Sequence, residues 1–118
     1  MGAAAKASAA VAVLLLVGIG ANAAQQRGTQ FWNLTGQTIT HLYLAPSGTD
    51  KWGTDQTRND PDGSVDDDER LAITGVGTGH YDAKLTQQNG RICMARNIAV
   101  KRGGIFSIDK KTLSDCKP

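Results

Sequence analysis

The stretch YDAKLTQQNGRICMAR, residues 81–96, decides the fold. Apolar and polar residues alternate on both sides of Asn89-Gly90, a pair that favours a two-residue type I′ turn because both central positions need positive φ. That turn predicts that Leu85 pairs with Met94 and that Tyr81 pairs with Ile98. The stretch therefore predicts an antiparallel hairpin with one buried face.

The predicted register divides the hairpin into two faces. The mainly apolar face carries Tyr81, Ala83, Leu85, Ile92, Met94 and Ile98, with Gln87 and Arg96 as polar exceptions. The mainly polar face carries Asp82, Lys84, Thr86, Gln88, Arg91, Cys93 and Asn97, with Ala95 as an apolar exception. This register places Cys93 on the outer surface, where a C-terminal tail could cross it.

Other segments also have the composition of strands. Residues 30–34, 38–44, 70–74 and 105–108 are rich in β-branched, aromatic or other apolar residues and are bounded by glycine-rich turns. Within residues 24–118, no window has apolar residues at helical spacing over three turns. The chain is therefore expected to be all-β, a small antiparallel β-sandwich or open barrel of five to six short strands that follows an N-terminal signal helix.

Residues 1–23 have the layout of a secretory signal peptide. Lys6 precedes the apolar run 9–20, and Ala21-Asn22-Ala23 supplies small residues at a cleavage site. The alternative is a membrane anchor, but the mostly apolar stretch is only about 17 residues long, against the ~20 that a spanning helix needs. We expect a single β domain over residues 24–118, periplasmic or secreted, with no membrane contact after cleavage.

The charge of the predicted mature chain is nearly balanced. Twelve basic residues oppose 11 acidic ones, which indicates neither a nucleic-acid partner nor an anionic membrane. The distribution is uneven, because residues 50–69 hold eight acids and two bases while residues 70–118 hold nine bases and three acids. This asymmetry can attract a charged partner or be satisfied within one molecule.

Two cysteines remain in the predicted exported part, Cys93 and Cys116. In an oxidising compartment a pair of cysteines most simply forms a disulfide. The alternative is a redox or metal-binding pair, but neither a CxxC spacing nor a neighbouring histidine accompanies them.

Residues 33–55 read N-x-TG-x-TI-x-x-LY-x-x-PSG-x-x-x-WG-x-D, and a G-x-YD strand and an NG hairpin follow at residues 79–90. This set of motifs resembles the pattern of a group of small exported proteobacterial proteins, in which the hairpin has DG or NG. The matching residues are Asn33, Thr35, Gly36, Thr38, Ile39, Leu42, Tyr43, Pro46, Ser47, Gly48, Trp52, Gly53, Asp55, Gly79, Tyr81, Asp82 and Gly90. The resemblance implies the fold and the exported compartment, and it carries no established activity. The acidic run and the two cysteines lie outside the pattern.

The run RNDPDGSVDDDE, residues 58–69, partly matches a twelve-residue calcium loop. Asp60, Asp62, Asp66 and Glu69 fall at ligand positions and Asp68 adds a carboxylate, so Ca²⁺ or another hard cation is the possible cofactor. Arg58 at the first ligand position, Pro61 within the loop and the lack of flanking helices count against an EF-hand. We expect mainly an acidic, mobile connection that binds cations weakly.

Catalytic motifs are sparse in this sequence. His41 and His80 lie about 40 residues apart, and no nucleophile-elbow or phosphate-binding glycine loop accompanies the serines. We therefore expect a non-enzymatic β-domain that binds an unknown protein or small ligand through the long acidic loop 45–69. Trp52 is the predicted partner-binding residue, because it lies within a polar segment. The alternative is a metal-binding domain that uses residues 60–69.

Overall fold

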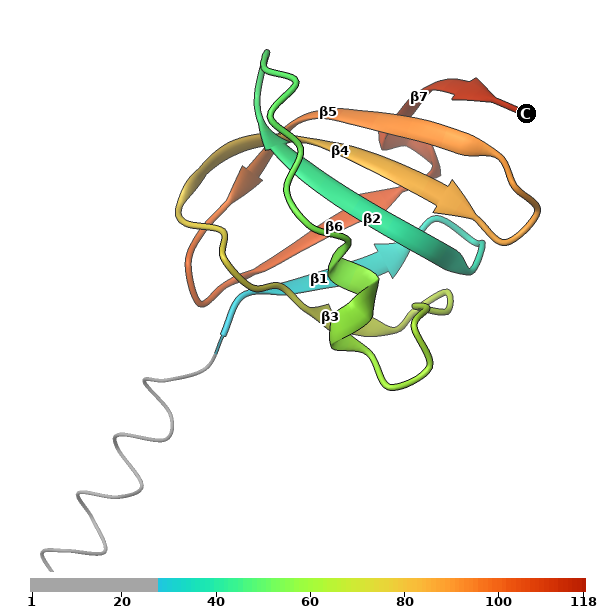
Figure 1. Ribbon diagram of the computed structural model, residues 1–118, viewed down its shortest axis with the longest axis horizontal. Coiled ribbons are helices and arrows are strands. Elements are labelled where there is room, and N and C mark those ends of the chain that lie inside the picture. Colours follow the sequence, from blue (N-terminus) through green and yellow to red (C-terminus); the bar gives the residue numbers. More distant parts are fainter. Residues whose placement is uncertain (1–27) are drawn as a thin grey trace, which may run out of the picture.

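The computed structural model describes residues 28–118, so the predicted signal peptide lies outside the described residues (Figure 1). Seven strands and two short 3₁₀ helices follow one another along the chain. Their bounds are β1 Gln30–Leu34, β2 Ile39–Pro46, η1 Gln56–Asn59, β3 Arg70–Ala72, β4 Gly79–Gln87, β5 Ile92–Val100, β6 Ile105–Asp109, η2 Lys110–Thr112 and β7 Leu113–Lys117. Within this part of the chain no helix is long and apolar enough to cross a membrane.

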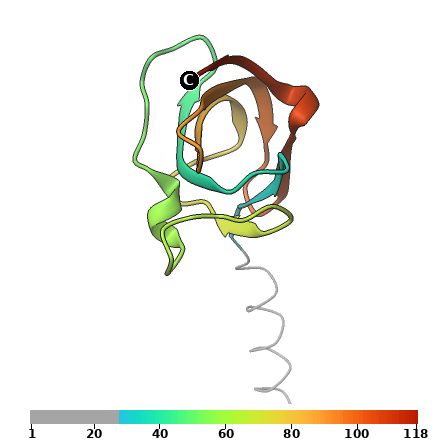
Figure 2. The same cartoon turned by 90° about the vertical axis from the view of Figure 1, so that its right-hand side faces the viewer.

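The strands form two packed sheets, of order β3-β1-β6 and β2-β4-β5-β7. Seen end-on, the two sheets surround a common interior (Figure 2). The predicted all-β sandwich is confirmed, with two differences. β1 and β6 run parallel, so the sheets are not wholly antiparallel. The C-terminal tail forms a seventh strand, β7, because it pairs with β5.

The core lies between the two sheets and follows from the alternation of side chains along each strand. In β1 and β6 the inward residues are Phe31, Asn33, Phe106 and Ile108, all buried. The rings of Phe31 and Phe106 lie 5.5 Å apart across the parallel pair. Each such apolar side chain contributes about 1.5–3 kcal/mol by leaving water.

The register of the β4–β5 hairpin differs from the prediction by one residue. Leu85 lies opposite Cys93 instead of Met94. The connection has three residues, because the Gln87 amide donates to the Arg91 carbonyl and only Gly90 has positive φ. A type I turn followed by one left-handed residue has this form. The slip turns Cys93 and Ala95 inward, and it turns Ile92 and Met94 outward.

A β-bulge then restores the predicted register further along the hairpin. Between the pairs Ala83–Ala95 and Tyr81–Ile98, β5 has one residue more than β4. The extra residue bends the strand at Asn97, whose φ is +56°. The predicted pairing of Tyr81 with Ile98 is therefore confirmed, although the pairs nearer the turn are shifted.

The predicted disulfide between Cys93 and Cys116 is present. Its position differs from the prediction, because Cys93 is fully buried on the inner face and does not lie on the outer surface. Cys116 lies in β7, the neighbour of β5. The bond therefore fastens the C-terminal edge strand to the sheet.

The segment 45–69 is anchored to the sandwich at several points. Its first two residues belong to β2, and η1 buries Gln56 and Thr57. Val65 is fully buried and pairs with Ile39 through two backbone hydrogen bonds of 2.9 Å. The buried Asn33 amide donates to the Val65 carbonyl at 3.0 Å, which fixes the acidic run beside β1. The segment is thus part of the fold.

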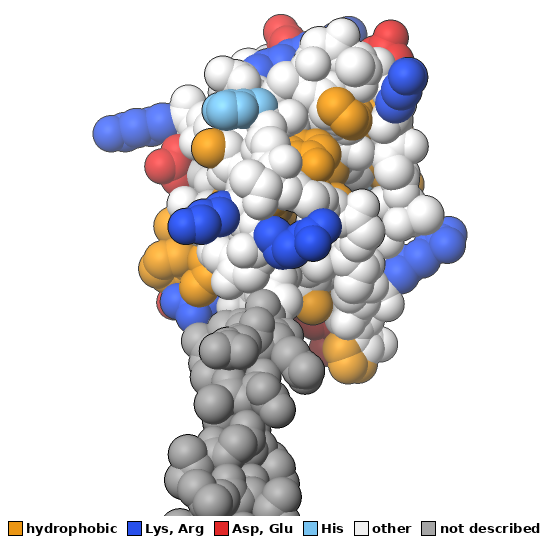
Figure 3. All heavy atoms as spheres, turned by 90° about the vertical axis from the view of Figure 1, so that its left-hand side faces the viewer, with side chains coloured by type: hydrophobic (Ala, Val, Ile, Leu, Met, Phe, Trp, Pro, Cys, Tyr) orange, Lys and Arg blue, Asp and Glu red, His pale blue; other side chains and the backbone are white. Residues whose placement is uncertain are grey.

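One end of the molecule is formed by the turns 74–78 and 101–104 (Figure 1). Lys and Arg side chains stand out on this face with neutral and apolar surface between them (Figure 3). Lys101 and Arg102 of the 101–104 turn are both exposed. Charge on this face is therefore scattered among neutral groups.

Candidate functional site

Two aromatic side chains and a lysine meet on the outer side of the four-stranded sheet. Tyr43 of β2 and Lys84 of β4 are directly paired across the two strands. The Lys84 ammonium lies 5.2 Å from the Tyr43 ring centre and 4.8 Å from the Trp52 ring centre. Both distances suit cation–π attraction. The segment 45–69 thus brings Trp52, the predicted partner-binding residue, onto the sheet, where it is half-buried.

An apolar groove continues this cluster across the sheet. It has a volume of about 480 Å³ and is lined by residues of β4, β5 and the C-terminal strand, among them Lys84, Ile92 and Met94. Ile92 is 41% exposed, which is unusual for a large apolar side chain in this protein. We name Tyr43, Trp52, Lys84, Ile92 and Met94 the aromatic–lysine surface.

An imidazole–carboxylate pair lies beside this surface. The His41 Nδ1 atom is 2.6 Å from an Asp55 carboxylate oxygen, and the His41 ring stacks on Tyr43 with centres 6.4 Å apart. Burial raises the pKa of Asp55, but hydrogen bonds from His41, Thr57 and the Leu42 amide outweigh it and hold the pKa below its ordinary value. Asp55 is therefore an anionic carboxylate, and its hydrogen bond orients the His41 imidazole.

This pair contains two of the groups of a nucleophilic triad, but among residues 28–118 no hydroxyl or thiol is hydrogen-bonded to His41 as the third group. Within residues 28–118, His41 forms a side-chain hydrogen bond only with Asp55. The geometry therefore provides an oriented imidazole that can accept or donate a hydrogen bond at the surface. It does not provide an activated hydroxyl or thiol.

Residues 53–57 cover the free edge of β2. The Gly53 amide donates to the Leu44 carbonyl at 2.9 Å. The Asp55 carboxylate accepts from the Leu42 amide at 3.1 Å, and the Thr57 hydroxyl donates to the Thr40 carbonyl at 3.1 Å. One backbone group on each of Thr40, Leu42 and Leu44 is thus satisfied at this edge, two of the three by side chains. Such covering removes a template for unwanted strand pairing.

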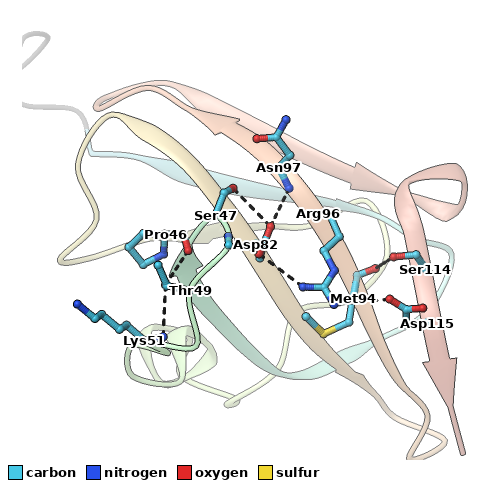
Figure 4. A network of polar contacts seen from close by, with 11 residues as sticks. Pro46, Ser47, Thr49, Lys51, Asp82, Met94, Arg96, Asn97, Ser114 and Asp115 are labelled. Atoms are coloured by element: carbon cyan, nitrogen blue, oxygen red, sulfur yellow. Dashed lines mark hydrogen bonds and ion pairs between the residues drawn. The ribbon is translucent and has the colours of Figure 1, made fainter.

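A second carboxylate, Asp82, fixes the start of the 45–69 segment (Figure 4). Its side chain is only 5% exposed. It accepts hydrogen bonds from the Asn97 amide at 2.9 Å and from the Gly48 amide at 3.1 Å, and Arg96 lies 3.5 Å away. The amide of Asn97, the amide of Gly48 and the charge of Arg96 lower the pKa of Asp82 against the effect of burial. Asp82 thus joins the bulge in β5 to the turn after β2.

Several carboxylates of the acidic run accept hydrogen bonds from separate donors. Asp60 accepts from the Asp62 amide at 2.8 Å, Asp66 accepts from the Thr38 hydroxyl at 3.0 Å, and Asp68 accepts from the Trp32 indole at 3.0 Å. The contacts with Thr38 and Trp32 hold the run against β1 and the β1–β2 turn.

The predicted metal ligands Asp60, Asp62, Asp66, Asp68 and Glu69 therefore do not form a common cage. In the described part of the chain, no three His, Cys, Asp or Glu side chains come together in a way that could hold a metal ion. Cation binding by this run stays a prediction, and it would require the carboxylates to leave their present partners.

Sequence reasoning missed most of the aromatic–lysine surface. Lys84 gave no signal, because its position depends on the pairing of β4 with β2. Ile92 and Met94 were assigned to the buried face by the predicted register. His41 and Asp55 are 14 residues apart, and only the path of the 45–69 segment brings them together.

No protein-family model, curated protein or solved structure matches this chain. The resemblance to small exported proteobacterial proteins therefore stays a prediction. Several residues of its pattern have structural roles: Gly53 and Asp55 cover the edge of β2, and Asp82 holds the turn at Ser47-Gly48.

Proposed function

We propose that this protein is an exported, non-enzymatic β-domain that binds a partner through the aromatic–lysine surface. The observation that carries the proposal is the position of Trp52. A polar segment brings this indole onto the outer side of a sheet, where it meets Lys84 and Tyr43 and remains partly exposed. Aromatic residues and methionine are enriched in protein interfaces relative to other surface.

The charge around the groove indicates the chemistry of the partner. Lys84, Arg96 and Lys117 line it, and Asp115 is the carboxylate among its lining residues. Asp115 lies 3.6 Å from Arg96, so its charge is partly neutralised. A groove lined by apolar side chains and by three cations favours a partner that carries an apolar group next to a carboxylate.

Export to the periplasm or beyond the cell is part of the proposal. Its support is the Lys6, apolar-run and Ala21-Asn22-Ala23 pattern together with the Cys93–Cys116 disulfide. N-terminal sequencing of the exported protein should find Ala24 as the first residue. An intact Met1 would contradict export by signal cleavage.

Site-specific photo-crosslinking in the native host tests the binding surface. A photoreactive phenylalanine analogue replaces Trp52 in one protein, and it replaces the exposed Ser107 of β6 in a matched control. We expect a discrete adduct from position 52 that is absent from position 107. The substitution Lys84→Glu should abolish the adduct from position 52, because this substitution reverses the charge beside Tyr43. Identical adducts from both positions, or an adduct that Lys84→Glu leaves unchanged, would contradict the proposal.

A further inference from the structure

A separate cavity opens at the end of the sandwich where the hairpin turn lies. It has a volume of about 440 Å³, within the ~300–1,000 Å³ range of small-molecule sites. Its polar lining comes from the β1–β2 turn, the end of β4, the hairpin turn and η2: Thr35, Gln37, Gln87, Asn89, Arg91 and Lys110. None of the five residues of the aromatic–lysine surface lines it.

Gln87 is the central feature of this cavity. It is the polar exception on the apolar face of the hairpin, and it is only 5% exposed. Its backbone amide and carbonyl are both paired within the hairpin, with Arg91 and Gly90. Its side-chain amide has no hydrogen-bond partner among residues 28–118. No side-chain nitrogen or oxygen in this range is both sealed from solvent and unpaired, so the amide opens onto the cavity.

The Gln87 amide is not sealed from solvent, so a molecule in the cavity can reach it. An apolar residue would fill the same inner-face position if packing alone decided it, so the amide points to a polar occupant of the cavity. The amide offers one acceptor and two donors, which suits a ligand that carries hydroxyl groups.

Two cationic side chains line the same cavity as the Gln87 amide, and no carboxylate in the lining neutralises them. Arg91 and Lys110 line the cavity, and its lining contains neither aspartate nor glutamate. Neither side chain lies within ion-pair distance of a carboxylate in the described chain. The cavity therefore has a positive potential that favours an anion.

The backbone of Gly36 helps to position the Lys110 side chain in the cavity wall. Gly36 has φ +82°, and a Cβ atom added to it would lie 2.9 Å from the Lys110 Cε atom. The lysine stem therefore packs directly on the glycine backbone. On the other side, the capping box between Asp109 and Thr112 fixes the short helix that carries Lys110. The ammonium group is thus positioned by its surroundings without an ion pair.

We propose that this cavity binds a small hydroxylated organic anion, such as a sugar acid or a sugar phosphate. The anionic group lies between Arg91 and Lys110, where charge-assisted hydrogen bonds hold it. Neighbouring hydroxyl groups pair with the Gln87 amide and with the amides of Gln37 and Asn89. The disulfide at Cys116 forms part of the wall and keeps β7 against the site.

Titrations followed by ¹H–¹⁵N NMR on the disulfide-bonded mature chain test this site. The probes are galacturonate, glucose 6-phosphate, glucose and inorganic phosphate. We expect galacturonate or glucose 6-phosphate to shift the Gln87 side-chain amide and the backbone amide of Gly90. The probe that binds more tightly identifies the acid group. Glucose and inorganic phosphate should bind at least about tenfold more weakly, because glucose lacks the anionic group and inorganic phosphate lacks the sugar hydroxyl groups.

Three variants separate the site from general charge effects. Lys110→Met should weaken the better probe at least about tenfold, and Gln87→Glu should abolish binding because it places a like charge beside the ligand. Lys101→Met removes an exposed cation away from the cavity and should leave the affinity unchanged. Lack of any shift with both acids, equal binding of inorganic phosphate, or equal effects of Lys110→Met and Lys101→Met would overturn the proposal. Spectra of the free variants confirm that each is folded.

Discussion

Replacing the buried carboxylate of Asp82 by an amide tests the joint between the β5 bulge and the turn after β2. In Asp82→Asn, one of the backbone amides of Asn97 and Gly48 faces an NH₂ group instead of a carboxylate oxygen. A hydrogen bond to a charged group contributes about 1.5–3 kcal/mol, so the free energy of unfolding should fall by about 2 kcal/mol. In a domain of this size that lowers Tm by about 8–16 °C.

Urea denaturation followed by far-UV circular dichroism measures this change. The matched control is Asp115→Asn, the same chemical change at the other carboxylate that Arg96 contacts, whose side chain is 62% exposed. An exposed ion pair contributes little, so the control should lose less than about 1 kcal/mol. Equal losses for the two variants would refute the reasoning.

The pH dependence gives a second check on Asp82. The pKa of this carboxyl is lower in the folded protein than its ordinary value, so its contribution is present above the unfolded pKa of about 3.9. The contribution is lost as the pH falls through the folded pKa. The difference in unfolding free energy between the natural protein and Asp82→Asn should therefore shrink at strongly acidic pH. A difference that stays constant would show that the charge of Asp82 is irrelevant.

Three further outcomes are expected. The double change Cys93→Ala and Cys116→Ala should destabilise the protein by about 3 kcal/mol, measured by thermal unfolding, because the bond closes a loop across a separation of 23 residues; no change in Tm would contradict this. Asp55→Ala should speed hydrogen exchange of the Leu42 amide and promote self-association on size exclusion, because it uncovers the edge of β2; unchanged exchange would refute the covering role. Calorimetric titration with Ca²⁺ should give a dissociation constant of about 1 mM or weaker, because the carboxylates of the acidic run are not converged; micromolar binding that Asp60→Ala abolishes would contradict it.

The sequence predicted the existence of the strands better than their register. The Asn-Gly pair marks a hairpin, but it suits both the two-residue turn and the three-residue turn that is observed. The competing registers bury either Ile92 and Met94 or Cys93 and Ala95. Hydrophobicity favours the first pair, whereas in the structure the second pair is buried and Cys93 is bonded to Cys116 of β7. The choice between the two registers depends on β7, which begins 13 residues after β5 ends. The local sequence pattern of the hairpin does not contain that information.

The candidate site was predictable only in part. Trp52 could be selected because an indole within a polar segment has little reason to be buried. Its partners could not be selected, since Tyr43 and Lys84 become neighbours only when β2 pairs with β4. The acidic run looked like a ligand set because its spacing is regular. In the structure four of these carboxylates, those of Asp60, Asp66, Asp67 and Asp68, instead accept hydrogen bonds from separate amide, hydroxyl and indole groups.

The cover on the edge of β2 also has a consequence for the order of folding. Its contacts join residues 9 to 17 positions apart, whereas the pairing of β2 with β4 joins Leu42 to Leu85. Loop-closure entropy grows with the logarithm of length, so the short closure costs about 1 kcal/mol less. A chain that emerges in sequence order can therefore cover this edge of β2 before β4 has appeared. Until β4 pairs with β2, the edge that β4 will occupy is then the one that β2 leaves open. The parallel pairing of β1 with β6 forms later still, because it closes a much longer stretch of chain.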